Sequence, residues 1–207
     1  MYEEITLATY NTIAASYATD TIFPVFRSMI EKSAALFLEL LPNHNRNNLL
    51  IVGSGDGRDG WLFKDAFRDI ILYDYSTAMM DIARVRLPGA RYIVNDLRDL
   101  QFPANSIDGV WASTCLYHLQ KKHLPSVINR IQGALQPGGL FYLNLKTGAG
   151  ELLDPHPPSY PQGGARFYAF YEKGEVMELL KQFEVLHYQD EHESLTIPYM
   201  QIIVKKH

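Results

Sequence analysis

A short apolar run that opens directly into a glycine-rich loop constrains the fold of this chain more than any other feature. Leu49 to Val52 are apolar, and the next five residues read GSGDG, with glycines at Gly53, Gly55 and Gly57. Glycine suits a tight turn after a buried strand and lets a ligand approach the main chain. A helix expected at 61–67 would offer its free N–H groups to an anionic ligand group. Glycine-rich turns also occur for conformational reasons alone, so this loop by itself identifies no ligand.

Apolar runs and helical patterns alternate through most of the chain. Strands are expected at 49–52, 70–73, 92–94, 107–113 and 140–145, and helices at 22–41, 61–67, 77–87 and 124–135. Such alternation predicts right-handed crossovers and a parallel sheet with helices on both faces. Ligands bind at the carboxyl ends of the strands in sheets of this kind.

The last sixty or so residues follow a different pattern. Residues 148–164 contain four prolines and four glycines and are expected to form a loop, followed by a helix at 173–181. Strands at 183–188 and 199–205 are close in sequence and should add an antiparallel element at one edge of the sheet. The fold class expected is therefore an α/β, Rossmann-like three-layer sandwich with a mostly parallel seven-stranded sheet and an antiparallel C-terminal strand.

Composition excludes several classes of function. The chain has 207 residues, which suits one domain, and a formal net charge of −4, which does not suit a nucleic-acid-binding surface. No apolar run is long enough to span a membrane, and the N-terminus lacks the pattern of a signal peptide. A lone Cys115 fits a reducing compartment. We expect a cytoplasmic monomer or homodimer that binds neither nucleic acid nor membranes.

Asp74 ends the second expected strand, about twenty residues after the glycine loop. An acid at this position accepts the hydroxyl groups of a ribose in nucleotide-binding folds, although it could equally lie at the start of a helix that Ser76 or Thr77 caps. The loop and the acid suit two cofactors, because Gly55, Gly57 and Gly60 also match the dinucleotide fingerprint. At this point a nicotinamide-dependent oxidoreductase and a nucleoside-binding transferase both remain open.

The order of further motifs resembles one known family. Residues 49–60 are similar to its first motif, 72–76 with Met79 to its second-strand motif, 95–97 to its third and 106–112 with 116–119 to its fourth, and 135–140 to its turn into strand five. This family is the class I S-adenosylmethionine-dependent methyltransferases of the methyltransferase type 11 kind. The segment from Tyr10 to Tyr17 also resembles the part that folds over the cofactor in this family.

The resemblance implies S-adenosylmethionine as the cofactor and a set of residues that bind it. Asp74 would bind the ribose and Asp96 would face the adenine amine. The full set implied is Tyr17, Gly53, Ser54, Gly55, Asp74, Tyr75, Met79, Asp96, Leu97 and Ser113. A single domain over 1–207 is then expected to comprise a helical cap (1–47), a cofactor-binding core (48–146) and a substrate-side loop with C-terminal strands (147–207).

One position departs from the family pattern. The family usually has an acid two residues before the first glycine, where it helps to anchor the methionine end of the cofactor, and this chain has Ile51 there. A cofactor-binding relative without catalysis is therefore an alternative, beside a nicotinamide-dependent oxidoreductase. The Pro137-Gly138-Gly139 turn favours the methyltransferase over the oxidoreductase.

Methyl transfer from a sulfonium is an in-line displacement that requires neither a metal nor a covalent enzyme intermediate. The protein aligns the reactants and excludes water, and a base helps only if the acceptor arrives protonated. His118, just beyond the fourth strand, is the candidate base, with a structural role as the alternative. Cys115 is expected to be a small buried residue and no metal site is expected.

The acceptor is expected to be a small molecule with an oxygen, nitrogen or thiol as the accepting group, or an oxyanion. Candidate substrate-binding residues flank the loop at 148–164, and surface charge or packing of a lid is an equal alternative for them. The candidates are Tyr10, Lys146, Arg166 and Tyr168.

Overall fold

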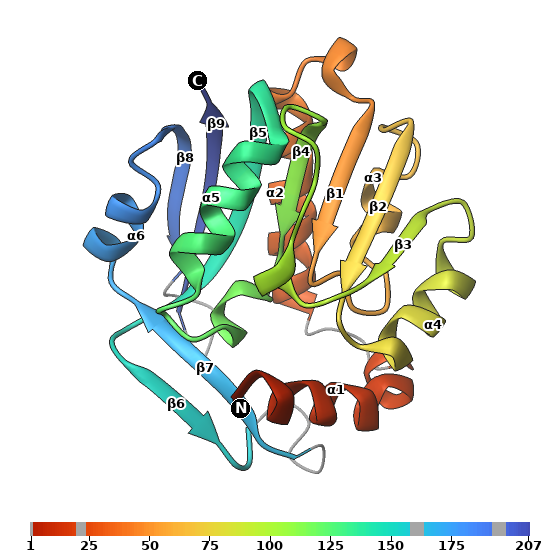
Figure 1. The fold of residues 1–207 in the computed structure, drawn as a ribbon, viewed down its shortest axis with the longest axis vertical. Coiled ribbons are helices and arrows are strands. Elements are labelled where there is room, and N and C mark those ends of the chain that lie inside the picture. The colour runs from red at the N-terminus through yellow and green to blue at the C-terminus, as the bar shows by residue number, and fades with distance from the viewer. Residues whose placement is uncertain (1, 20–23, 158–163, 192–197) are drawn as a thin grey trace.

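A single mixed sheet organises the chain in a computed structural model that describes residues 2–19, 24–157, 164–191 and 198–207. Its strands run in the order β3-β2-β1-β4-β5-β7-β6, with β9 paired to β5 and β8 paired to β9 (Figure 1). The strands are β1 (Asn48–Val52), β2 (Asp69–Asp74), β3 (Arg91–Val94), β4 (Ile107–Ala112), β5 (Leu135–Thr147), β6 (Glu151–Asp154), β7 (Arg166–Tyr171), β8 (Phe183–Glu191) and β9 (Tyr199–Lys206).

Helices flank this sheet on both faces, as the alternating pattern predicts. They are α1 (Tyr2–Thr19), α2 (Pro24–Leu40), α3 (Gly60–Phe63), α4 (Thr77–Arg86), α5 (Leu124–Ala134) and α6 (Lys173–Leu179), with short 3₁₀ turns η1 (Asn43–Asn45), η2 (Leu97–Asp99) and η3 (Leu116–His118). The helix expected at 61–67 is shorter than predicted, because the chain leaves α3 in a turn that still buries Phe67. None of the helices that the structure describes combines the length and the apolar character needed to cross a membrane.

The α/β fold with a mostly parallel sheet is confirmed, but within the described part of the chain the sheet has nine strands and not seven. β1 to β5 pair in parallel, and β8 and β9 form the expected antiparallel element. The two additional strands are β6 and β7. They pair antiparallel with each other, and β7 also pairs in parallel with the end of β5 at Lys146 and Thr147.

The expectation of a loop throughout 148–164 is thus wrong for its first part. Its prolines begin only at Pro155, so the residues of β6 retain the main-chain donors that strand pairing needs. Residues 158–163 of that expected loop lie outside the described part of the chain.

Alternate residues of β1 face two separate apolar layers. Leu49 and Ile51 pack with α2 residues such as Phe37, whereas Leu50 and Val52 pack on the opposite face with α5. Ile51 is buried, with 2% of its surface exposed, as its alternation with Val52 predicts. α2 therefore belongs to an outer layer of the sandwich. Of α1 and α2, α1 lies across the carboxyl ends of the strands (Figure 1), and the helical cap expected over 1–47 stays a prediction.

Candidate active site

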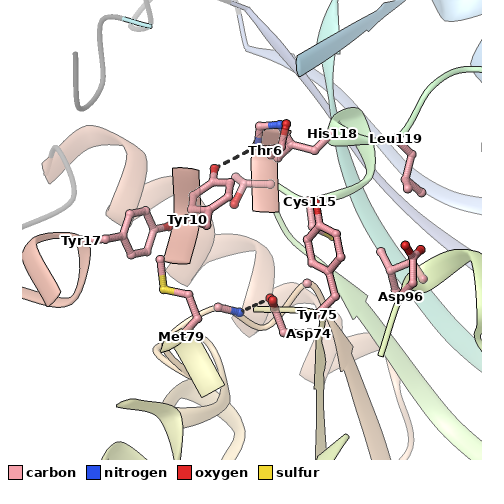
Figure 2. Close-up of a pocket in the computed structure, with 14 residues that line it drawn as sticks. Thr6, Tyr10, Tyr17, Asp74, Tyr75, Met79, Asp96, Cys115, His118 and Leu119 are labelled. Atoms are coloured by element: carbon pink, nitrogen blue, oxygen red, sulfur yellow. Dashed lines mark hydrogen bonds between the residues drawn. The ribbon is translucent and has the colours of Figure 1, made fainter. Parts of the chain in front are cut away.

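A cleft lies where the carboxyl ends of the central parallel strands meet α1. It holds about 720 Å³ of empty space including its mouth, a size that suits a small-molecule ligand. The lining comes from α1, the glycine loop, the ends of β2 and β3, and the turn after β4 (Figure 2). The lining residues are Thr6, Tyr10, Tyr17, Gly53, Gly55, Asp74, Tyr75, Met79, Asp96, Leu97, Thr114, Cys115, His118 and Leu119.

The glycine loop shapes the floor of this cleft. Gly53 and Gly55 have φ angles of +60° and +52°, a region that other residues avoid. A Cβ added at Gly53 would lie 2.1 Å from the Cβ of Cys115, whereas one added at Gly55 would meet no atom within 4 Å. Gly53 is therefore required by packing, and Gly55 leaves open space at the wall of the cleft.

Asp74 joins this loop to the end of β2. Its carboxylate accepts the main-chain N–H of Gly55 and that of Ser76, each at 2.8 Å (Figure 2 draws the first). Burial raises the pKa of Asp74. Ser76, and not Asp74, caps α4, because its hydroxyl accepts the N–H of Met79 at 3.1 Å. The main chain of Tyr75 also donates to this carboxylate, and Asp74 lines the cleft with the acceptor capacity that these donors leave.

Asp96 lies at the other end of the cleft, where it caps η2. Its carboxylate accepts hydrogen bonds from the side chain and the main-chain N–H of Arg98, at 2.6 to 3.0 Å. Burial alone would raise the pKa of Asp96, but the hydrogen bonds and charge of Arg98 outweigh burial and lower it. This carboxylate stays ionised beside Leu97 and Tyr75, which also line the cleft.

Two expected cofactor residues do not line the cleft. Ser54 and Ser113 are each 7% exposed and lie behind its wall. Ser113 instead hydrogen-bonds to Asp59, whose carboxylate also accepts the indole N–H of Trp111 at 2.9 Å. Burial raises the pKa of Asp59, and its charge acts on Tyr17 and Cys115 in the cleft wall.

Asp59 is not among the residues that the sequence predicts to bind the cofactor. The available signal was an acid at the start of the helix that follows the glycine loop, a position where acids are common for reasons of helix stability alone.

His118 is held in one orientation by both ring nitrogens. Its Nδ1 lies 2.7 Å from the carbonyl oxygen of Phe167, and its Nε2 lies 3.0 Å from the hydroxyl of Tyr10 (Figure 2). A carbonyl only accepts, so Nδ1 carries the proton, and Nε2 of the neutral ring accepts from Tyr10. Burial lowers the pKa of His118 to about 3. The ring is neutral near pH 7 and is a weak base.

Cys115 was expected to be buried, but it is half-buried and lines the cleft. Its thiol donates to the carbonyl of Val52 at 3.1 Å, and burial raises its pKa. A thiolate nucleophile is therefore disfavoured. Within the described residues, no three metal-ligating side chains come together.

The expected substrate residues form a second layer behind His118. Lys146, Arg166 and Tyr168 are 6%, 3% and 8% exposed. The Lys146 ammonium lies 4.8 to 5.2 Å from the ring centres of Tyr117, Tyr168 and Tyr199. These residues do not line the main cleft, but the rings of Tyr168 and His118 are 5.1 Å apart. The structure thus brings Tyr10, His118, Lys146, Arg166 and Tyr168 together.

Comparison with known proteins agrees with this geometry. Residues 49–139 match the family model described as a methyltransferase domain. The chain is 28% identical over 122 residues (58% of this chain, 24% of the relative) to the biotin biosynthesis bifunctional protein BioHC of Cellvibrio japonicus. It is 24% identical over 116 residues (56% and 45%) to the malonyl-[acyl-carrier protein] O-methyltransferase of Pectobacterium atrosepticum.

Solved structures extend the likeness of fold to the whole chain. The 1,6-didemethyltoxoflavin-N1-methyltransferase of Burkholderia thailandensis, solved with S-adenosylhomocysteine, superposes with a TM-score of 0.70 at 19% identity, over 99% of this chain and 88% of that one. The curated relatives are matched over 24% to 57% of their length, so the chain spans at most somewhat over half of each. The matched domain and the fold agree: residues 49–139 match a methyltransferase domain, and the chain has the fold of solved S-adenosylmethionine-dependent methyltransferases.

Proposed function

We propose that this chain binds S-adenosylmethionine in the cleft and transfers its methyl group to a small molecule held between α1, His118 and β7. The open space over Gly55, with the Asp74 carboxylate fixed beside it, is the observation that carries this proposal. When bound, the cofactor supplies an electrophilic methyl group on a positively charged sulfur. The tasks left to the chain are to orient the two reactants and to exclude water.

The residues of the cleft suit the parts of such a cofactor. Asp74 has lone pairs available for the ribose hydroxyls, and Asp96 is an ionised acceptor for the adenine amine. Asp59 would supply negative charge near the methionine end, where the family acid is replaced by Ile51. Tyr17 and Met79 come from α1 and α4, which pack together over this end of the cleft.

His118 is better suited to orienting Tyr10 than to removing a proton. Its Nε2 lone pair already accepts the Tyr10 hydroxyl, and its low pKa makes proton transfer from an acceptor unfavourable. The acceptor that fits this arrangement is one that needs no strong base. The names of relatives include both an O-methyltransferase and an N1-methyltransferase, so they do not select the accepting atom.

Asp74→Asn tests the ribose assignment by calorimetry with S-adenosylhomocysteine. We expect binding to weaken at least tenfold, because charge-assisted hydrogen bonds of roughly 1.5–3 kcal/mol are weakened. The matched control is Asp81→Asn, an acid on the surface of α4 whose side chain is 72% exposed. It should leave affinity unchanged.

A second titration separates ribose binding from support of the glycine loop. The parent should prefer adenosine to 2′,3′-dideoxyadenosine, and Asp74→Asn should lose most of this preference. An unchanged preference in a folded variant would falsify the ribose assignment. Stabilisation by NAD but not by S-adenosylhomocysteine would contradict the proposed function as a whole.

A further inference from the structure

Two buried cations stand side by side next to the cleft. Lys146 near the end of β5 and Arg166 at the start of β7 are 6% and 3% exposed. Strand pairing places Lys146 opposite Phe170 of β7, the strand that Arg166 begins, and opposite Tyr199 of β9, and the charge of Arg166 acts on Lys146. Among the residues that the structure describes, no carboxylate lies within ion-pair distance of Lys146.

Burying a cation without a neighbouring anion is costly, and this cost lowers the pKa of Lys146. Burial, followed by the charge of Arg166, lowers the pKa of Lys146 to about 8. The faces of three tyrosine rings offset part of this cost. A lysine at a tyrosine face does not need such burial, since Lys173 lies 4.1 Å from the ring centre of Tyr188 and is exposed.

Among the described residues, the charged and titratable groups around the Lys146 ammonium come from η3, β9, β7 and β6. From η3 come Tyr117 and His118, from β9 comes Tyr199, and from β7 come Tyr168 and Arg166. Asp154 lies opposite Arg166 in the antiparallel pairing of β6 with β7. The charge of Asp154 acts on Tyr168. Burial raises the pKa of each of these tyrosines, so they offer neutral hydroxyl donors.

We infer that the methyl acceptor is an anion, a carboxylate or a phosphonate-type oxyanion, which Lys146 and Arg166 bind, and that the methyl group is transferred to its oxygen. This inference rests on the proposed function and deepens it. Two cations with several hydroxyl donors form a recognition site for an oxyanion. Tyr10 and His118 line the cleft in front of these cations, and the ring centre of Tyr10 lies 5.8 Å from the Arg166 guanidinium, so the acceptor would lie in the cleft against this wall.

The chemistry balances without a base. A lone pair of the acceptor oxygen forms the bond to the methyl carbon while the carbon–sulfur bond breaks and its electron pair goes to sulfur. The acceptor loses one negative charge and the sulfur its positive charge, and no proton moves. A neutral His118 with a pKa of about 3 is consistent with this, since an ionised acid needs no deprotonation.

The experiment is calorimetry on the protein saturated with S-adenosylhomocysteine. Benzoate and phenylphosphonate are the anionic probes, which distinguish carboxylate from phosphonate, and benzamide is the neutral control. We expect one anion to bind at least tenfold more tightly than benzamide. Lys146→Gln should remove this difference while affinity for S-adenosylhomocysteine stays within about twofold, and Lys173→Gln, the exposed lysine at a tyrosine face, should change neither.

The pH dependence gives a readout that a merely structural lysine would not show. Lys146 is charged below its pKa of about 8, so anion affinity should be full at pH 7 and fall as pH rises from 8 to 10. Lys146→Arg should bind the anion with a flat profile over this range. If Lys146→Gln fails to fold, protection of Lys146 from acylation by benzoate or phenylphosphonate at pH 8, read by mass spectrometry, tests the same contact.

The two proposals fail in different ways. Equal binding of benzamide and both anions, or unchanged anion affinity in Lys146→Gln, overturns the anionic acceptor while the S-adenosylhomocysteine titration still supports the cofactor site. Anion binding to the protein without any binding of S-adenosylhomocysteine overturns the proposed function and leaves the anion site standing.

Discussion

Ile51 shows how one residue can depart from a family pattern while the surrounding side chains compensate. Its side chain belongs to the apolar layer that also holds Phe63 and Trp111, and it pairs across the sheet with Leu72 and Trp111. A carboxylate is nevertheless close by, because the indole of Trp111 donates to Asp59. We propose that Asp59, at the start of α3, supplies the carboxyl group that the family places on strand one.

We expect Ile51→Asp to be destabilising in the absence of ligand. The substitution places an unpaired carboxylate in an apolar layer and removes packing, which together cost about 3–5 kcal/mol. Part of the loss should be recovered with S-adenosylhomocysteine if the new acid contacts it. Ile51→Val, at about 0.5–1.5 kcal/mol, is the control for packing alone. Urea unfolding with and without ligand measures both, and a ligand-free variant as stable as the parent would refute this account.

Sequence predicts single residues well where they end a strand and poorly where two distant strands meet. Asp74 and Asp96 follow apolar runs, so their place at the cleft could be foreseen from the parallel sheet. Ser113 directly follows β4, but its side chain is buried and hydrogen-bonds to Asp59, and the sequence of so short a run does not show which face a residue takes. The pairing of Lys146 with β7 depends on tertiary contacts that no local pattern records.

At the scale of elements, α1 is held over the site by polar contacts as well as by a small apolar cluster with α4. Its buried residues include Thr6 and Thr9. The Thr9 hydroxyl donates to the carbonyl of Ala165 at 2.6 Å, and the Thr6 hydroxyl accepts the N–H of Phe167 at 3.0 Å. At its other end, Arg58 and Arg86 donate to the last carbonyls of the helix while pairing with Asp56. Polar contacts hold α1 over the cleft, so local opening of this helix should cost less than unfolding of the core.

Thr9→Val should loosen this helix. The substitution removes the donor to Ala165 and leaves a carbonyl unsatisfied, a change of about 1 kcal/mol or roughly fivefold in opening. Amide hydrogen exchange over 2–19 should speed up, and affinity for S-adenosylhomocysteine should fall about two- to fivefold. Thr12→Val is the matched control, because Thr12 is exposed on the same helix and bonds only to Ala8 within it. Equal exchange in both variants would show that the contact with β7 does not hold α1.

The elements of the core could be read from their periodicity, whereas the substrate side could not. Long apolar runs predict β1, β2 and β4 within a few residues. β6 is only four residues long, between Gly150 and Pro155, and its partner β7 begins twelve positions after β6 ends. Short strands of this kind are stabilised by pairing with their partner strand more than by their own sequence, so the sequence alone does not predict the hairpin of β6 and β7.

Across the whole molecule the site is electrically polarised. Asp74, Asp96 and Asp59 surround the end proposed for the cofactor, while Lys146 and Arg166 lie at the end proposed for the acceptor. A positively charged cofactor and an anionic acceptor would each face protein charge of the opposite sign. The two ligands would also attract each other directly across the point where the methyl group is transferred.

This polarity predicts that the two ligands bind cooperatively, with the charge at sulfur as the cause. Sinefungin carries a protonated amine where S-adenosylmethionine has its sulfonium, whereas S-adenosylhomocysteine is neutral there. Two unit charges about 4 Å apart interact by at most about 4 kcal/mol at an effective dielectric constant near 20, so a tenfold effect, about 1.4 kcal/mol, is a modest expectation.

The favoured anion should bind about tenfold more tightly to the sinefungin complex than to the S-adenosylhomocysteine complex. Linkage requires the anion to tighten sinefungin by the same factor. Benzamide, which lacks the charge, should show no preference between the complexes. Calorimetry in both orders of addition measures both factors, and an anion that binds the two complexes equally would show that its oxygen does not lie next to the sulfur.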